Sequence, residues 1–290
     1  MNKSGKISSG GHNVKVADMQ VNRLIPGNEI MKVGPFVLLD HLYPVIQKPG
    51  EPKPYKGQYA HPHRGIVTVS YVLSGSLHHA DSCNRCGIAE EGGMQWMKAG
   101  RGIIHDERPG KEFQRKGGLL HALQFWINLP SVNKEDASEY RSLAENEIPE
   151  LELPENSGVL RILLGGTGVI KAPVDTYLDE FIYHIRLNPK STFTYATKVD
   201  LEHAVFVPAD EIIVNDQPTG KSHLLVPPSD GTAIHFHNPG IMCADLFIFG
   251  GREYLEPIVQ EGPFVMTSRS GITQAYRDFF DGRYGKLKAD

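Results

Sequence analysis

The sequence predicts an all-β protein made of two β-barrels with a short C-terminal helix. Three observations support this prediction. Glycine and proline account for 30 and 20 of the 290 residues, and they separate short apolar runs roughly every ten residues. Several of these runs alternate between apolar and polar side chains, which is the period of a strand. A polar stretch near the middle of the chain separates two halves of the same texture, so we expect two domains of similar architecture.

The first half contains four strand-like segments. The clearest alternation places Val67, Val69 and Tyr71 on one face of a strand and polar residues on the other. A later segment is interrupted by Gly100 and Gly102, so we expect it to form a pair of strands. The four predicted segments are 33–42, 65–79, 92–107 and 119–130.

Residues 131–158 are rich in charged side chains and contain two prolines. We interpret this stretch as a linker that carries a short helix, and we place the domain boundary within it. The N-terminal barrel is then predicted to cover residues 1–135 and the C-terminal barrel residues 136–290.

Strand-like runs resume in the second half, which ends in a predicted helix. Ile272, Tyr276, Phe279 and Phe280 recur at helical spacing, which indicates a short helix near the C-terminus. The strand-like runs before it are 159–166, 180–189, 203–216, 222–228, 232–240 and 244–251.

Composition and charge narrow the class of protein. Hydrophobic residues make up 40% and charged residues 22%, as in a globular domain. A net charge of -4 argues against direct nucleic-acid binding. We expect no membrane span and no secretory signal, because no apolar run approaches the ~20 residues a span needs. Three cysteines favour a reducing compartment, so we expect a cytoplasmic protein, or a nuclear one in a eukaryote.

A pair of histidines stands two residues apart in the sequence HPHRG. On a strand, His61 and His63 project to the same side. If the strand continues to Val67, this side is the apolar one and faces the barrel interior. Pro62 cannot donate to a strand ladder, so the segment is expected at a sheet edge or a strand start. Two imidazoles in an apolar interior need partners, and a metal ion satisfies both.

A second pair with the same spacing follows in the sequence GRGIIHDERP. His105 and Glu107 also share one face of a predicted strand. Three imidazoles and one carboxylate suit Fe(II), Mn, Co, Ni, Cu or Zn better than Ca or Mg. Six-coordinate geometry would leave two positions open, which is typical of a catalytic metal site. Either pair alone is more often an ordinary set of core or surface histidines, but both together indicate one site.

Two stretches that contain these pairs resemble the two cupin motifs, and more specifically the pirin family. They are GQYAHPHRGIVTVSYVLSG and GGMQWMKAGRGIIHDERPG. GPFVLLDHLYP and EPIVQEGPFVM are also similar to pirin stretches, so the resemblance covers roughly residues 30–285. It implies a monomeric bicupin, with two cupin-type barrels and one metal ion in the N-terminal barrel.

The resemblance also implies the ligands and the activity. The residues that match the family's metal ligands are His61, His63, His105 and Glu107. The family's metal is most often iron. Some pirins are similar in activity to quercetin 2,3-dioxygenases, oxidoreductases that open a flavonol ring with O2. The chain departs from the family at Val67, where pirins usually carry a glutamate, so only Glu107 can supply the carboxylate.

Other histidines and cysteines give weaker signals. Cys83 and Cys86 form a C-x-x-C with no second such pair, so a hairpin is favoured over a redox or zinc site. Adjacent His78 and His79 point to opposite sides of a strand, either on the outer surface or beside the ligands. His235 and His237 form a second H-x-H that could mimic the first site. The second half has no histidine and glutamate pair at the same spacing, and His203 stands alone, so we expect a second barrel without metal.

Two functions are compatible with such a site. The first is a metal-dependent dioxygenase whose small phenolic substrate and O2 meet at the open metal positions, with Glu107 accepting the substrate's hydroxyl proton. The alternative is a non-enzymatic iron- or redox-sensing regulatory protein that binds a transcription-related protein partner. We favour the enzyme, because an open interior site of histidines and a carboxylate is suited to binding ligands.

Overall fold

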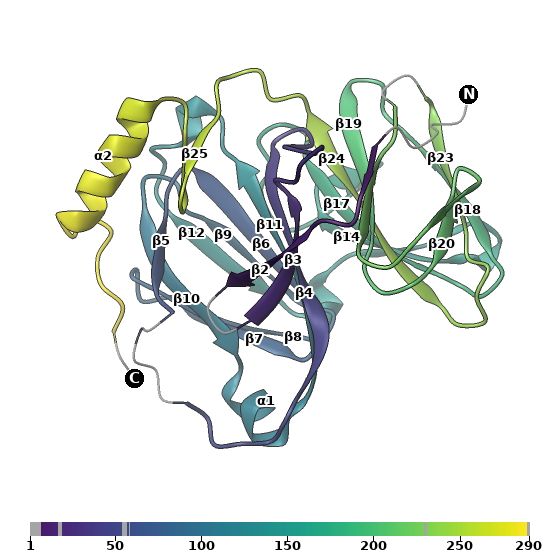
Figure 1. Cartoon of the computed structure of the whole chain (residues 1–290), viewed down its shortest axis with the longest axis horizontal. Helices are drawn as coiled ribbons and strands as arrows, with labels where there is room; N and C mark the ends of the chain where they lie inside the picture. The colour runs from purple at the N-terminus through teal and green to yellow at the C-terminus, as the bar shows by residue number, and fades with distance from the viewer. Residues whose placement is uncertain (1–6, 17–18, 54–56, 58, 229–230, 289–290) are drawn as a thin grey trace. The chain divides into compact units, whose positions relative to one another are not determined.

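The computed structural model describes residues 7–16, 19–53, 57, 59–228 and 231–288 (Figure 1). These residues form strands, turns and two α-helices, α1 (Lys111–Lys116) and α2 (Arg269–Phe280). The prediction of an all-β protein with a short C-terminal helix is confirmed. No helix in this part of the chain is both long enough and apolar enough to cross a membrane.

The chain divides into two compact units, each drawn from three separate stretches. Unit 1 comprises Met1–Val14, Val21–His41 and Ile148–Tyr254, and unit 2 comprises Lys15–Gln20, Leu42–Glu147 and Leu255–Asp290. The two domains predicted from the sequence, in contrast, are each one continuous stretch. Their boundary stays a prediction, because a compact unit need not be a domain that folds alone.

The strands that carry the two histidine motifs lie in a four-stranded sheet of unit 2. Its order is β5 (His61–His63), β10 (Ile103–Pro109), β7 (Ser76–Asp81) and β8 (Cys86–Glu90). A seven-stranded sheet has the order β12 (Glu139–Leu143), β9 (Met94–Lys98), β6 (Ile66–Ser74), β11 (Gly118–Asn128), β4 (Phe36–Gln47), β3 (Met19–Ile25) and β2 (His12–Val16).

The expectation that HPH continues the apolar face of the next strand is wrong. β5 and β6 belong to different sheets, and Gly65 turns the chain between them with a φ of 80°. A Cβ at Gly65 would lie 2.1 Å from the carbonyl oxygen of Val265, so only glycine fits this close approach. Thr68 and Ser70 are buried like the apolar residues of β6, so this strand is covered on both faces.

Unit 2 also contains the C-terminal helix and the hairpin before it, β25 (Val259–Glu261) and β26 (Phe264–Met266). Ser268 begins α2, because its side chain accepts the backbone N–H of Gly271 at 3.1 Å. Ile272 packs against Phe264 in a small apolar cluster, as its helical spacing predicts. Phe280, which the same spacing placed on the apolar face, is 79% exposed.

Unit 1 has a seven-stranded sheet and a four-stranded sheet around an apolar core. The first has the order β1 (Ile7–Ser9), β22 (His223–Val226), β19 (Leu201–Val207), β24 (Ala244–Arg252), β17 (Phe181–Leu187), β14 (Gly158–Leu164) and β13 (Glu150–Glu152). The second has the order β18 (Thr192–Ala196), β23 (Ala233–His237), β20 (Ile212–Val214) and β21 (Gln217–Thr219), and β15 (Gly166–Thr167) pairs with β16 (Ile170–Lys171).

The predicted linker contains two edge strands as well as short helical turns. β12 pairs with β9 and β13 pairs with β14, each at the end of a sheet. Only short 3-10 turns occur among its described residues, η1 (Ser131–Asn133), η2 (Glu145–Glu147) and η3 (Pro154–Asn156). Its charged residues are compatible with edge strands, where one side of the backbone is left to solvent.

A buried ion pair joins α2 to the residue that follows the first histidine pair. The Arg64 guanidinium donates to Asp278 at 2.6 Å and to Glu135 at 2.6 Å, and Arg64 is 5% exposed. Burial raises the pKa of Asp278, but hydrogen bonds from Arg64 and Gln274 outweigh it and hold the pKa below its ordinary value. The pair therefore stabilises the folded chain above the ordinary pKa of an aspartate, and this contribution is lost as the pH falls below it.

We expect Asp278→Ala to lower the free energy of unfolding by about 2 to 3 kcal/mol, because it leaves much of the buried Arg64 charge uncompensated. Denaturant unfolding at neutral pH measures this loss. The matched control is Asp281→Ala on the same helix, whose side chain is 59% exposed. Equal unfolding midpoints for the two variants would contradict the assignment.

Candidate metal centre

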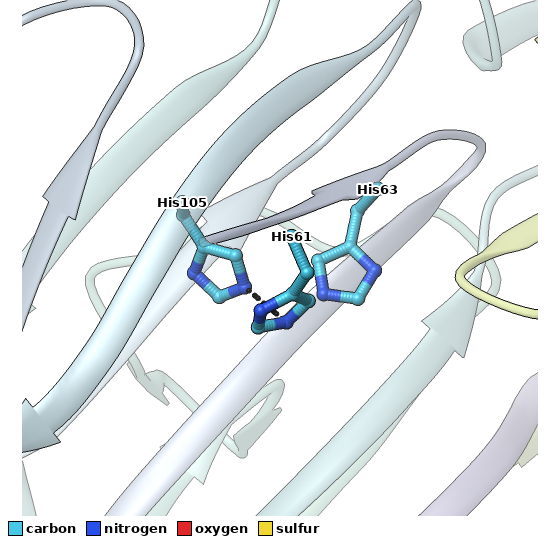
Figure 2. A group of neighbouring side chains, drawn as sticks. All are labelled: His61, His63 and His105. Atoms are coloured by element: carbon cyan, nitrogen blue, oxygen red, sulfur yellow. Dashed lines mark hydrogen bonds between the residues drawn. The ribbon is translucent and has the colours of Figure 1, made fainter. Parts of the chain in front are cut away.

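Three imidazoles meet where β5 pairs with β10. The antiparallel register sets His61 opposite His105 and His63 opposite Ile103, so the three histidine side chains project to one side (Figure 2). Their candidate ligand nitrogens all lie within 4.8 Å of one another. The Nε2 atoms of His61 and His105 are 3.0 Å apart, drawn as the dashed line in Figure 2.

The hydrogen bonds of the first two rings determine which nitrogen faces the cluster. His61 Nδ1 lies 2.9 Å from the carbonyl oxygen of Tyr59, and His63 Nδ1 lies 3.1 Å from that of Pro263. A carbonyl only accepts, so in each ring Nδ1 carries the proton and Nε2 keeps a lone pair. This arrangement of backbone acceptors behind the rings is typical of metal-binding histidines.

Burial disfavours the charged form of His105 and of His63. His105 is fully buried and His63 is 1% exposed. Burial, followed by repulsion from the neighbouring imidazoles, holds the pKa of His105 and of His63 well below the ordinary histidine value. The Nε2 atoms of His61 and His105 lie at hydrogen-bond distance from each other, 3.0 Å, so one cation beside them could bind both. The donor set therefore fits a metal ion, and these three residues could hold one.

Glu107 lies two residues beyond His105 on the same face of β10. Its carboxylate accepts Ser70 Oγ at 2.7 Å on one oxygen and Gln124 Nε2 at 2.6 Å on the other. Its nearest set of candidate ligands is a second group, formed with His105 and His79. The structure thus places the predicted carboxylate next to His105 and His79, in a group separate from the one that His105 forms with His61 and His63, and holds it there with two donors.

His79 is a member of the site that sequence reasoning left unassigned. Of the two placements open to it, the one beside the ligands is correct: it is 1% exposed and pairs across the sheet with Glu107. His79 Nδ1 lies 3.4 Å from His105 Nδ1, and its Nε2 lies 3.3 Å from Asp81 Oδ2. Its ring stacks on Tyr140 at 4.0 Å and 8°.

These contacts form a series of hydrogen bonds that runs from His105 through His79 to Asp81. A carboxylate accepts the His79 Nε2 proton, which leaves His79 Nδ1 to accept from His105 Nδ1. His105 Nε2 then keeps its lone pair toward His61. The carboxylate of Asp81 is fixed in turn by Arg85 at 2.7 Å. Only the cross-strand register could have revealed this series of hydrogen bonds, because Asp81 and His105 are far apart in the sequence.

Val67, the position at which the sequence departs from the family pattern, lies away from the histidines. Ser70 contacts Glu107, and residues at odd and even positions of β6 face opposite sides. Val67 is therefore on the other face, where it is 1% exposed and pairs with Lys98 and Ile127. A carboxylate at this position would not reach the cluster along this strand.

The remaining sequence candidates lie elsewhere. Cys83 and Cys86 are free and exposed, Cys83 in the turn between β7 and β8 and Cys86 at the start of β8, as the hairpin interpretation expects. His235 and His237 are half-buried on β23 of unit 1, and His235 Nδ1 contacts Thr194 Oγ1 at 2.8 Å. His203 is buried on β19 against Phe181 and Tyr195.

Comparison with known proteins agrees with the motifs. The model of the Pirin family matches residues 18–127, and that of the Pirin C-terminal cupin domain matches residues 182–285. Pirin of Mus musculus is 33% identical over 279 residues, covering 92% of this chain and 88% of the mouse protein. The expected cupin-type fold is confirmed.

Two solved structures are similar to this one. A quercetin 2,3-dioxygenase from Acinetobacter baumannii superposes with a TM-score of 0.91 at 27% identity, covering 99% of this chain and 100% of that chain. A bacterial pirin from Escherichia coli in complex with nickel(II) has a TM-score of 0.64 at 16% identity, covering 84% of this chain and 96% of that chain. This second similarity shows the fold.

Proposed function

This chain belongs to the pirin family, and we propose that it is a metal-dependent dioxygenase of the quercetin 2,3-dioxygenase type. Its substrate would be a flavonol or a related phenolic, whose ring is opened with O2. The observation that carries the proposal is the convergence of three buried or half-buried imidazoles, with a fixed carboxylate beside His105. The similarity to a structure named quercetin 2,3-dioxygenase supports it.

His61, His63 and His105 would hold the metal through Nε2, with Glu107 as the fourth ligand. This mixed nitrogen and oxygen set suits Fe(II), Mn, Co, Ni, Cu or Zn. Fe(II) comes first because the metal of the pirin family is most often iron. When bound, the metal would act as a Lewis acid and bring the phenolic oxygens and O2 together. Trp126 packs edge-on against His63 at 4.8 Å and forms part of the apolar surroundings that exclude water.

The chain's own residues provide the proton chemistry. Glu107 would accept the proton of the substrate hydroxyl as the phenolic oxygen approaches the site. Its two oxygens offer about four acceptor positions, so the bonds from Ser70 and Gln124 leave room for this proton. The same two bonds orient the carboxylate before substrate arrives, which lowers the cost of reaching the reactive geometry.

Replacing His79 tests the series of hydrogen bonds that runs from His105 through His79 to Asp81. His79→Ala removes the acceptor of the His105 Nδ1 proton, so we expect the metal dissociation constant to rise by roughly tenfold to a hundredfold. Competition with a chromophoric chelator measures it. His78→Ala, one residue earlier on β7, is the matched control. If the two variants bound metal equally tightly, the His79 contact would have no role in the site.

Turnover of quercetin tests the proposed activity. The full chain, loaded separately with Fe(II), Mn, Co, Ni, Cu and Zn, is incubated with quercetin with and without O2. We expect quercetin loss and a ring-opened product only with O2 and only in metal-loaded protein. A chain that binds metal but opens no phenolic ring with any of these metals contradicts the proposal. A protein partner retained only by one oxidation state of the metal would then favour the regulatory alternative.

A further inference from the structure

Unit 1 contains a cavity of about 260 Å³ that the proposed metal chemistry does not use. Three aromatic residues from the two sheets of unit 1 line it, Phe181 and Tyr183 on β17 and Tyr195 on β18. The ring centroids of Phe181 and Tyr183 are 4.9 Å apart, and those of Tyr183 and Tyr195 are 6.1 Å apart. Such an open aromatic wall favours a flat apolar ligand.

The charges around this cavity favour an anion. Its two acidic residues already have partners: Asp179 pairs with Arg252 at 2.6 Å, and Glu180 accepts two backbone N–H groups. Burial also raises the pKa of Glu180. The two lysines of the lining, Lys171 and Lys198, form no ion pair with any described residue. A ligand in the cavity therefore meets two cations without counter-ions.

One hydroxyl group of the lining also remains to be satisfied. Tyr183 donates to the carbonyl oxygen of Gly166 at 2.7 Å, whereas the Tyr195 hydroxyl has no hydrogen-bond partner within the described ranges. Burial raises the pKa of Tyr195, so this phenol stays protonated and can donate. A half-buried donor beside two lysines suits an oxygen anion better than a neutral ligand.

We propose that this cavity binds a small aromatic carboxylate of a single ring, such as a benzoate. The ring would lie against Phe181 and Tyr195, and the carboxylate would face Lys171, Lys198 and the Tyr195 hydroxyl. A cavity of about 260 Å³ lies just below the roughly 300–1,000 Å³ that is usual for drug-sized ligands, which favours a single ring over a larger molecule. This site is independent of the proposed metal centre, because every residue of the lining belongs to unit 1.

Calorimetric titration of the metal-free full chain with three probes tests the proposal. Benzoate carries both ring and charge, benzyl alcohol lacks the charge, and cyclohexanecarboxylate lacks the aromatic ring. We expect benzoate to bind at least roughly tenfold more tightly than either of the others. The double variant Lys171→Gln with Lys198→Gln should weaken benzoate binding roughly tenfold, whereas Lys221→Gln, an exposed lysine elsewhere in unit 1, should not change it.

Two further variants test where the benzoate binds. Tyr195→Leu should weaken benzoate binding, and thermal unfolding of each variant checks that the fold is retained. His61→Ala with His105→Ala, which disables the proposed metal centre, should leave benzoate binding unchanged. The proposal is overturned if the wild-type chain binds no benzoate at about 10 mM, if the lysine pair has no effect, or if the histidine double variant abolishes binding. None of these outcomes depends on whether quercetin is turned over.

Discussion

Replacing His105 by alanine is expected to abolish both metal binding and quercetin turnover. His105 is fully buried at the centre of the cluster, opposite His61 and two residues from Glu107. Its loss removes one of the proposed ligands and the link to His79 together. We expect metal affinity to fall by at least about a hundredfold, since a site with too few ligands competes poorly with water.

Two controls make this expectation specific. His12→Ala removes an exposed histidine of β2 and should leave metal content unchanged. His61→Ala removes a half-buried ligand and should lose metal with less effect on folding than His105→Ala, because less buried volume is emptied. Metal analysis and thermal unfolding of the three variants separate the two effects. A folded His105→Ala chain that retains its metal would refute the assignment.

Glu107→Gln is expected to lower turnover by about a hundredfold or more, the usual contribution of a positioned general base. The amide can still accept from Gln124 with its oxygen and donate to Ser70 with its nitrogen, so the surrounding hydrogen bonds survive. It cannot take up a proton as a carboxylate does. The variant should therefore remain folded and keep its three histidine ligands.

The measurement is the rate of quercetin loss at equal metal occupancy. Equal occupancy matters because Glu107 is also a proposed ligand, and excess metal restores it if affinity alone has fallen. Glu91→Gln, an exposed carboxylate after β8, is the matched control and should react at the wild-type rate. A Glu107→Gln chain that turns over quercetin like the wild type when fully loaded would show that another group accepts the proton.

Much of the site could be read from local spacing. The i and i+2 pattern placed His61 with His63, and His105 with Glu107, on common faces, and the sheet register then brought the two pairs together. The strand segments and the C-terminal helix followed from alternation and helical spacing in the same way. These features depend on neighbours within a few residues, which is why a single sequence reveals them.

The parts that sequence reasoning missed depend on contacts between distant strands. His79 joins the site because β7 pairs with β10, and Ser70 and Gln124 reach Glu107 from β6 and β11. The continuous face from His63 to Val67 was wrong because Gly65 turns the chain into another sheet. Neither the register nor this change of sheet is visible in local periodicity.

The edge strands in the linker were missed for a similar reason. Residues 131–158 are polar, and their charges and prolines suggested a linker that carries a short helix. In the structure they supply β12 and β13, edge strands whose pairing partners lie elsewhere in the chain. Edge strands tolerate charge and proline, so composition alone does not distinguish them from a linker.

The central claim is that this chain inserts O2 into a phenolic ring. Its most direct test is mass spectrometry of the product formed from quercetin by the metal-loaded chain under isotopically labelled O2. We expect a ring-opened product that carries both labelled oxygen atoms. Glu107→Gln should form this product only at its reduced rate. A product whose new oxygen comes from water, or no labelled product with any of the six metals, would contradict it.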